Sequence, residues 1–282
     1  MTAIQELIKE IKKLKPIPAV INRIIEAVDQ PGSSMDEIAA IIKYDPAVTA
    51  MLLKTCNSAF FGLKNPAESV EEAAMFLGTD QIVELVLLKS GAAIMTGKQE
   101  GYGLQEGAMW KYAVSSALIA KQVARQLSME NINTIFTAAL LKDLGKIILD
   151  GVVADKIQKI DQLVVENNFS FQEAEKQVIG IDHAELGAMI AKMWKFSPRM
   201  VKIIRNHHLQ DESMQAEKDI IVVYLADCIC MMLGLAVGAD ALSYQFHTQA
   251  MDALGLDAEG VSRIMASFTA DMDDVEALLE IL

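Results

Sequence analysis

Apolar residues recur at the spacing of one helix face along almost the whole chain, and proline, glycine and small polar residues interrupt this pattern at regular intervals. The pattern predicts an all-α, multi-helical fold. In the first half, the helices are expected to cover residues 19–29, 34–44, 46–57, 69–77 and 79–95. In the second half, they are expected to cover residues 104–127, 134–144, 151–167, 171–178, 182–194, 197–208 and 214–235, followed by two short helices.

The helical pattern lapses between Gly97 and Gly107, where glycine and polar residues dominate. Such a segment is typical of a linker, so we expect a boundary near residue 103. The chain then divides into a helical bundle over residues 1–103, a second helical region over 104–245 and an acidic helical segment over 246–282. Because this last segment carries many acids and a single arginine, it is expected to be a solvated appendage or a partner surface.

The composition narrows the class of protein. A hydrophobic content of 52% supports a substantial core, whereas a formal net charge of −13 repels phosphate backbones and argues against direct nucleic-acid binding. The three cysteines, Cys56, Cys228 and Cys230, cannot form a regular disulfide framework and are expected to be buried, reduced thiols. Since the N-terminus also lacks the apolar region of a signal peptide, we expect a cytoplasmic protein.

One stretch, Ile220 to Ala239, is long and apolar enough to resemble a membrane span, but Asp227 lies near its centre. A buried helix therefore fits better, and no membrane insertion is expected. Burying an unpaired carboxylate costs several kcal/mol. Asp227 must consequently meet a proton, a hydrogen-bond donor, a cation or a metal.

A second acid, Asp143, is placed by the pattern in the last turn of a helix that ends at Gly145. There a carboxylate faces the negative end of the helix dipole, which is unfavourable. Asp143 therefore needs a cation, and the nearest ones in sequence are Lys142 and Lys146.

Three histidines lie at predicted helix ends. His183 follows Asp182 and precedes Glu185 with the spacing of a capping box, although an ordinary surface histidine fits that position as well. His207 and His208 end another helix, where imidazoles either interact with the dipole or bind a metal. Together with the two acids, these histidines form the ligand set of transition-metal hydrolases, but spacing does not show that they converge.

The order of motifs resembles the HDOD family, the HD-related output domain, over about residues 15–210. In the first half the motifs are Leu14-Lys15-Pro16-Ile17-Pro18, Asp45-Pro46-Ala47-Val48, Cys56-Asn57-Ser58-Ala59-Phe60-Phe61-Gly62 and Phe76-Leu77-Gly78. In the second half they are Trp110-Lys111-Tyr112, Leu140-Leu141-Lys142-Asp143-Leu144-Gly145-Lys146, Asp182-His183-Ala184-Glu185-Leu186-Gly187, Trp194 and His207-His208. Several motifs in the expected order make this resemblance specific.

The resemblance implies a helical bundle followed by a region similar to HD phosphohydrolases. In those enzymes an early histidine, a His-Asp pair, further histidines and a late aspartate bind one or more metals. Here Tyr112 stands at the early histidine position and Lys142 at the histidine of the pair. The remaining positions match Asp143, His183, His207, His208 and Asp227. The resemblance leaves two alternatives for these five residues: a residual site that holds Fe, Mn, Ni or Zn with fewer ligands, or a hydrogen-bonded polar network with a structural role.

The altered ligand set argues against catalysis, because the Lys142 ammonium can replace a metal ion beside Asp143 electrostatically. The sequence therefore favours a non-catalytic output or scaffold module of bacterial signal transduction, which acts through contacts with signalling proteins. The alternative is a metal-dependent phosphohydrolase acting on a nucleotide or cyclic dinucleotide through the five matching residues. A third reading is a sensor that binds a nucleotide without cleaving it.

Overall fold

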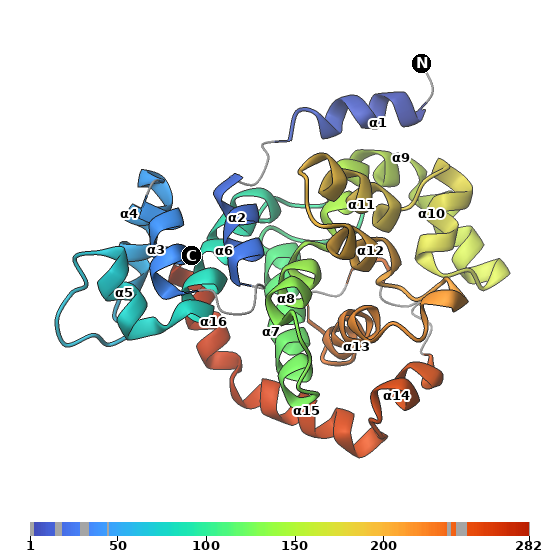
Figure 1. Ribbon diagram of the computed structural model, residues 1–282. Coiled ribbons are helices and arrows are strands. Elements are labelled where there is room, and N and C mark those ends of the chain that lie inside the picture. The colour runs from blue at the N-terminus through green and yellow to red at the C-terminus, as the bar shows by residue number, and fades with distance from the viewer. Residues whose placement is uncertain are drawn as a thin grey trace.

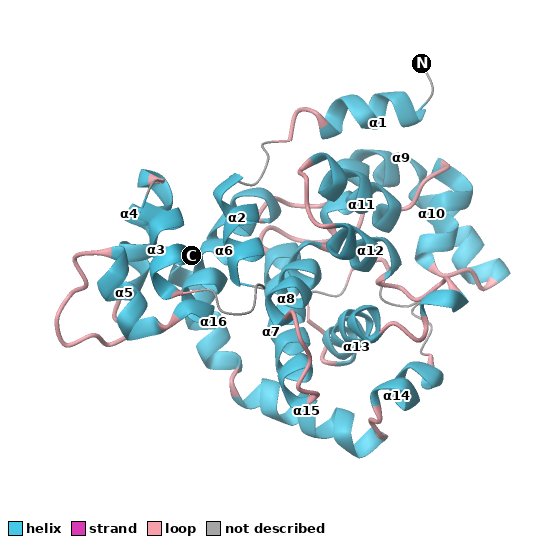
Figure 2. Cartoon of the chain, viewed as in Figure 1, coloured by secondary structure: helices cyan, strands magenta, loops and turns pink. Residues whose placement is uncertain are grey.

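The computed structural model describes residues 3–14, 19–28, 34–43, 45–235, 238–240 and 247–281. Throughout these ranges the regular structure is helical, apart from one isolated bridge between Gln99 and Leu104 (Figure 2). The predicted all-α class is confirmed.

The first half of the chain forms a group of short helices at one side of the molecule (Figure 1). Its helices are α1 (Ala3–Ile11), α2 (Ala19–Val28), α3 (Met35–Lys43), α4 (Pro46–Cys56), α5 (Val70–Leu77) and α6 (Thr79–Met95). Asp45 caps α4, accepting the backbone N–H groups of Ala47 and Val48, and Pro46 occupies the first turn. Helix α1 stands apart from this group and packs on α9 of the second half.

The second half builds the larger helical region around two central helices, α7 and α8. Its helices are α7 (Ala108–Gln126), α8 (Ile132–Leu141), α9 (Leu144–Asn167), α10 (Phe171–Ile179), α11 (His183–Met193), α12 (Pro198–Asn206) and α13 (Lys218–Met232). Helix α7 packs on α8 and α13, and α11 packs on α9 and α12. These contacts bring the ends of α8, α11 and α12 together with the middle of α13.

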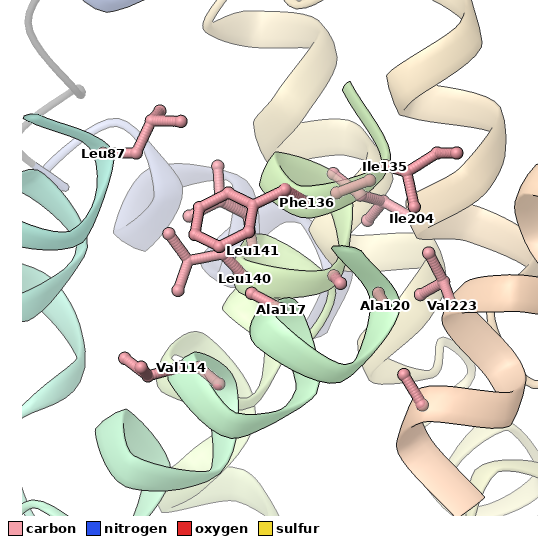
Figure 3. Close-up of a cluster of buried hydrophobic side chains, with 14 of the residues drawn as sticks. Leu87, Val114, Ala117, Ala120, Ile135, Phe136, Leu140, Leu141, Ile204 and Val223 are labelled. Carbon is pink, nitrogen blue, oxygen red and sulfur yellow. The ribbon is translucent and has the colours of Figure 1, made fainter. Parts of the chain in front are cut away.

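The two halves share one hydrophobic core. Figure 3 shows Leu87 of α6 in one cluster with Phe136 and Leu140 of α8, Val114 of α7 and Val223 of α13. All five side chains are buried. Because α6 belongs to the first half, the core continues across the predicted boundary near residue 103, and the division of the chain into domains stays a prediction.

The expected linker between Gly97 and Gly107 packs against the second half. Tyr102 is fully buried, and the Gly101 backbone N–H donates to Asp150 Oδ1 at 2.8 Å. A Cβ atom on Gly101 would lie 2.2 Å from the carbonyl oxygen of Asp150, so only glycine allows this approach to α9. The segment therefore places Tyr102 in the interior.

The acidic end of the chain forms α14 (Thr248–Leu254), α15 (Ala258–Ala270) and α16 (Met272–Ile281), and α15 and α16 are the two short helices expected in the last thirty residues. Helix α15 packs on α7 and buries Ile264 and Phe268, and Lys111 Nζ on α7 contacts Glu276 Oε1 at 2.6 Å. One face of this segment is therefore packed on the body of the molecule.

The apolar stretch around Asp227 forms α13, whose residues from Ile220 to Cys230 are buried between other helices. None of the described helices is long and apolar enough to cross a membrane. Cys56, Cys228 and Cys230 are buried free thiols, as predicted.

Candidate functional site

The two acids that the sequence singled out meet in the interior around one lysine. Asp143 lies between α8 and α9, and Asp227 lies on α13; their side chains are 5% and 3% exposed. The Lys142 ammonium contacts the Asp143 carboxylate and lies 2.7 Å from Asp227 Oδ1. Lys142 itself is fully buried, so the interior of the site holds a cation supplied by the chain.

The local setting of Asp143 differs from the prediction. Helix α8 ends at Leu141, and Asp143 occupies the N-cap position of α9, where the positive end of the helix dipole favours a carboxylate. The predicted helix end at Gly145 is wrong, because Gly145 lies in the first turn of α9. Close packing explains why residue 145 is a glycine, because a Cβ atom there would lie 1.9 Å from the carbonyl oxygen of His183. This glycine thus lets α9 approach α11.

A second lysine and two tyrosines complete this polar network. Lys146 Nζ lies 3.0 Å from Asp143 Oδ1 and 2.7 Å from Asp240 Oδ2. The Tyr112 hydroxyl donates to Asp227 Oδ1 at 2.7 Å, and Lys142 Nζ lies 4.6 Å from the centre of the Tyr112 ring. Lys146 Nζ makes a similar cation–π contact, 5.6 Å from the centre of the Tyr102 ring.

Burial and charge oppose each other in this network. Burial disfavours the Lys142 ammonium, but Asp143 and Asp227 outweigh burial and raise its pKa. Burial likewise disfavours the Asp143 carboxylate, yet Lys142 and Lys146 hold its pKa well below the ordinary value. For Asp227, burial dominates and raises the pKa. Lys142 therefore remains a cation at neutral pH.

His183 is the first residue of α11 and is 1% exposed, so the surface-histidine alternative is wrong. Asp182 caps the helix by accepting the Glu185 backbone N–H at 2.7 Å. The Glu185 side chain contacts Lys176 and Arg205 instead of returning to the N-cap. Only one half of the predicted capping box is formed.

The three predicted histidines lie together beside Asp143. His183 Nδ1 lies 2.6 Å from Glu175 Oε2, and His183 Nε2 lies 2.7 Å from His208 Nε2. His207 Nδ1 lies 2.7 Å from the carbonyl oxygen of Ile204. One nitrogen from each imidazole lies within 4.8 Å of the other two.

Asp143 connects the imidazoles to the lysine network, because its Oδ1 atom lies 3.8 Å from His183 Nε2 and 3.9 Å from His207 Nε2. The five predicted residues therefore converge in one buried region. They do not surround a single empty position, since Lys142 occupies the space between Asp143 and Asp227. The region has a lysine-filled carboxylate part and an imidazole part.

The imidazoles of the second part differ in protonation. Burial lowers the pKa of His207 to about 3 and, with His207 and His183 nearby, lowers the pKa of His208 well below its ordinary value. Burial acts on His183 as well, but the Glu175 carboxylate outweighs it and raises the His183 pKa. His207 and His208 are thus neutral at pH 7 and can offer nitrogen lone pairs.

The imidazole part fits a transition metal. Imidazole nitrogens are ordinary ligands of Zn, Fe, Ni and Cu, and His207 Nε2 is buried without a hydrogen-bond partner among the described residues. The carboxylate part does not fit a metal, because the Lys142 ammonium already holds both acids.

The two parts also differ in access. His208 lines a surface pocket of about 290 Å³, together with residues of α10 and α11 such as Lys176 and Glu185. On the other side, Asp143 and Lys146 line a cavity of about 10 Å³, which holds one water molecule at most. Solvent therefore approaches the imidazoles more readily than the carboxylates.

Sequence reasoning missed three members of the site: Tyr102, Glu175 and Asp240. It named Lys146 as a candidate cation for Asp143, but not the contact of Lys146 with Asp240. The sequence could have indicated Glu175, because its position shares one helix face with the apolar residues Phe171 and Ile179, four residues away on either side. An acid at such a position is the same anomaly as Asp227. Tyr102 and Asp240 lie outside regular helices and had no such signal.

Comparisons with solved structures agree with the all-α architecture. An HDOD domain protein of unknown function from Geobacter sulfurreducens is 23% identical, with a TM-score of 0.74 over 99% of this chain and 97% of that one. A candidate phosphohydrolase from Shewanella amazonensis SB2B is 21% identical, with a TM-score of 0.67 over 98% and 97% of the two chains. A candidate signal transduction protein from Marinobacter aquaeolei VT8 is 20% identical, with a TM-score of 0.73 over 95% of this chain and 60% of that one.

Among curated proteins, an uncharacterized protein of Treponema pallidum (strain Nichols) is 22% identical over 212 residues. The match covers 75% of this chain but only 40% of that relative. The family model of the HDOD domain matches residues 14–210, which include the first-half motifs, Lys142, Asp143 and all three clustered histidines. The chain therefore belongs to the HDOD domain family.

Proposed function

We propose that this protein is a non-catalytic signalling module that acts through contacts with other proteins. The observation that carries the proposal is the position of the Lys142 ammonium between Asp143 and Asp227. A divalent cation at this position would displace or repel the ammonium, and both carboxylates already have a partner. The carboxylate part of the site therefore has the charge balance of a structural network.

The volume near the carboxylates supports the same proposal. The cavity lined by Asp143, Lys146 and Tyr112 measures about 10 Å³, whereas pockets for small-molecule ligands occupy roughly 300–1,000 Å³. A nucleotide would not fit there without a rearrangement of the surrounding helices. The name of the Marinobacter relative agrees with a signalling role.

The proposed partners are signalling proteins, and the net charge of −13 supports the absence of direct nucleic-acid binding. We place the protein in the bacterial cytoplasm, a compartment that suits its three free thiols.

The test is to purify the protein without an affinity tag that carries metal, to measure bound Fe, Mn, Ni and Zn, and to assay phosphoester hydrolysis. We expect no turnover with nucleotides or cyclic dinucleotides, even when metal is added. Stoichiometric metal together with turnover that Asp143→Ala abolishes would overturn the proposal.

The second candidate is a metal-dependent phosphohydrolase that acts on a nucleotide or cyclic dinucleotide. The cluster of His183, His207 and His208 favours it, as does the pocket of about 290 Å³ that His208 lines. A metal held there would polarise a phosphoryl oxygen and activate a water molecule. Turnover that is lost in His208→Ala would favour this candidate, whereas thermal stabilisation by a nucleotide without turnover would favour a nucleotide sensor.

A further inference from the structure

Glu175 is a fully buried acid that contacts Tyr102 through one carboxylate oxygen and His183 of the imidazole cluster through the other. Its Oε1 atom accepts a hydrogen bond from the Tyr102 hydroxyl at 2.5 Å. Its Oε2 atom accepts the His183 backbone N–H at 3.0 Å and lies 2.6 Å from His183 Nδ1. Within the described chain, His183 is the one ion-pair partner of Glu175.

The geometry fixes which nitrogen of His183 carries a proton toward Glu175. The backbone N–H of His183 can only donate, so Oε2 acts as an acceptor. An acceptor nitrogen 2.6 Å from the same oxygen would repel it, and His183 Nδ1 must therefore be an N–H donor. His183 Nε2 is then the atom presented to His208.

His207 is held in the same way by a different partner. The carbonyl oxygen of Ile204 can only accept, so His207 Nδ1 donates to it at 2.7 Å. In a neutral imidazole this leaves a lone pair on Nε2, and that atom is buried without a hydrogen-bond partner in the described chain. Two imidazoles thus have Nδ1 fixed by an outer acceptor and Nε2 directed inward.

An outer acceptor on one ring nitrogen, with the other nitrogen directed inward, is the arrangement that orients histidine ligands of metals. We propose that Glu175 is a positioning residue that holds His183 as a transition-metal ligand, and that Tyr102 holds Glu175 in turn. This inference rests on the metal-binding capacity of the imidazole part, which our second candidate function also uses, and it does not require catalysis.

Helix α10 places Glu175 beside His183. Helix α10 begins with a complete capping box between Ser170 and Glu173 and ends at Gly180, whose φ of 94° turns the chain toward α11. Burial of the Glu175 carboxylate is unfavourable, and three hydrogen-bond donors offset it: the Tyr102 hydroxyl, the His183 backbone N–H and His183 Nδ1. The surface pocket that His208 lines gives an ion a route to the cluster.

The test compares Glu175→Met, which removes both acceptor oxygens, with Glu175→Gln, which keeps one. Co²⁺ is titrated into each metal-free protein and followed by its visible absorption, and Zn²⁺ affinity is measured by competition with a chelator. We expect one ion per wild-type chain and an affinity that falls about 10- to 100-fold in Glu175→Met, with Glu175→Gln between the two. Tyr102→Phe should weaken binding less than Glu175→Met.

Glu173→Gln is the matched control, because it lies on the same helix and glutamine can preserve the capping box. Its affinity should equal that of the wild type. A wild-type chain that binds no Co²⁺, or a Glu175→Met variant that binds it as tightly as the wild type, would overturn the inference.

A second measurement decides the matter if Glu175→Met fails to fold. Nitrogen-15 NMR of metal-free wild type, at a pH where His183 is neutral, should show the proton on Nδ1, and a proton on Nε2 would contradict the inference. Phosphoester turnover in the wild type would defeat the non-catalytic proposal but leave the role of Glu175 intact. Conversely, unchanged affinity in the Glu175 variants would leave the non-catalytic proposal standing.

Discussion

Lys142 Nζ lies 2.7 Å from Asp227 Oδ1, and both side chains are almost completely buried. The pair joins the loop after α8 to the middle of α13; Asp143 also contacts the Lys142 ammonium, and the Tyr112 hydroxyl donates to Asp227 Oδ1. A buried ion pair contributes little net stability compared with an apolar pair, but loss of one partner leaves a bare charge in the interior. Lys142 thus stabilises both acids in the interior by supplying their shared cation.

Lys142→Met should therefore lower the free energy of unfolding by about 3–5 kcal/mol. The methionine fills a similar volume, so the loss reflects the removal of the cation that Asp143 and Asp227 share more than a cavity. Chemical denaturation, followed by circular dichroism, measures the change.

Lys111→Met is the matched control, since Lys111 forms an ion pair with Glu276 in which the two side chains are 37% and 53% exposed. We expect a loss below about 1 kcal/mol. Equal losses in the two variants would show that Lys142 stabilises the fold no more than an exposed ion pair does.

Tyr112 and Lys142 stand where the family resemblance implies histidine, and histidine at both positions should create metal affinity in the carboxylate part. In Tyr112→His combined with Lys142→His, the ammonium is gone and two imidazoles face Asp143 and Asp227, which is a ligand set for Mn or Fe. We expect Mn²⁺ binding detectable by electron paramagnetic resonance. The variant with glutamine at both positions should bind no Mn²⁺, and a histidine variant that also binds none would contradict the expectation.

The neutral imidazoles predict loss of stability in mild acid. The pKa of His207 is about 3 in the folded protein, below the ordinary value of about 6.5 in the unfolded chain. The unfolded state therefore binds more protons between these values, so stability is complete above about pH 6.5 and falls as the pH drops toward 3. His208 acts in the same direction, whereas the raised pKa of His183 opposes it just above pH 6.5.

The measurement is the free energy of unfolding between pH 4 and 8 for wild type and His207→Asn. Below pH 6, the free energy of unfolding should fall with decreasing pH less steeply in the variant than in wild type, by about 1 kcal/mol per pH unit. An unchanged slope in His207→Asn would mean that His207 titrates normally.

The sequence is most informative where a residue is physically out of place. Asp227, in a helix that is apolar on every face, predicts a buried polar centre, and the structure places Lys142, Asp143 and Tyr112 around it. Glu175 has the same signature on a shorter helix. Such anomalies are readable because burial of an unpaired charge is too costly to occur by chance.

Tertiary contacts that leave no local pattern could not be predicted. Tyr102 reaches Glu175 from a segment with the composition of a linker. Gly145 has the sequence context of a helix end, yet it lies within α9 because the backbone of α11 comes too close for any side chain. A glycine required by packing and a glycine that ends a helix look alike in one sequence.

Two glycines of α9 should therefore respond to alanine with opposite signs. In Gly145→Ala the new methyl group would lie 1.9 Å from the His183 carbonyl oxygen, so α9 and α11 must separate, at a cost of about 1–3 kcal/mol or more. In Gly151→Ala no atom lies within 4 Å of the new methyl group, and the better helix former should add about 0.5–1 kcal/mol. Thermal and urea unfolding of both variants measure the difference. A neutral Gly145→Ala would mean that the close approach of α9 to α11, which brings Asp143 to His183, is not required by the fold.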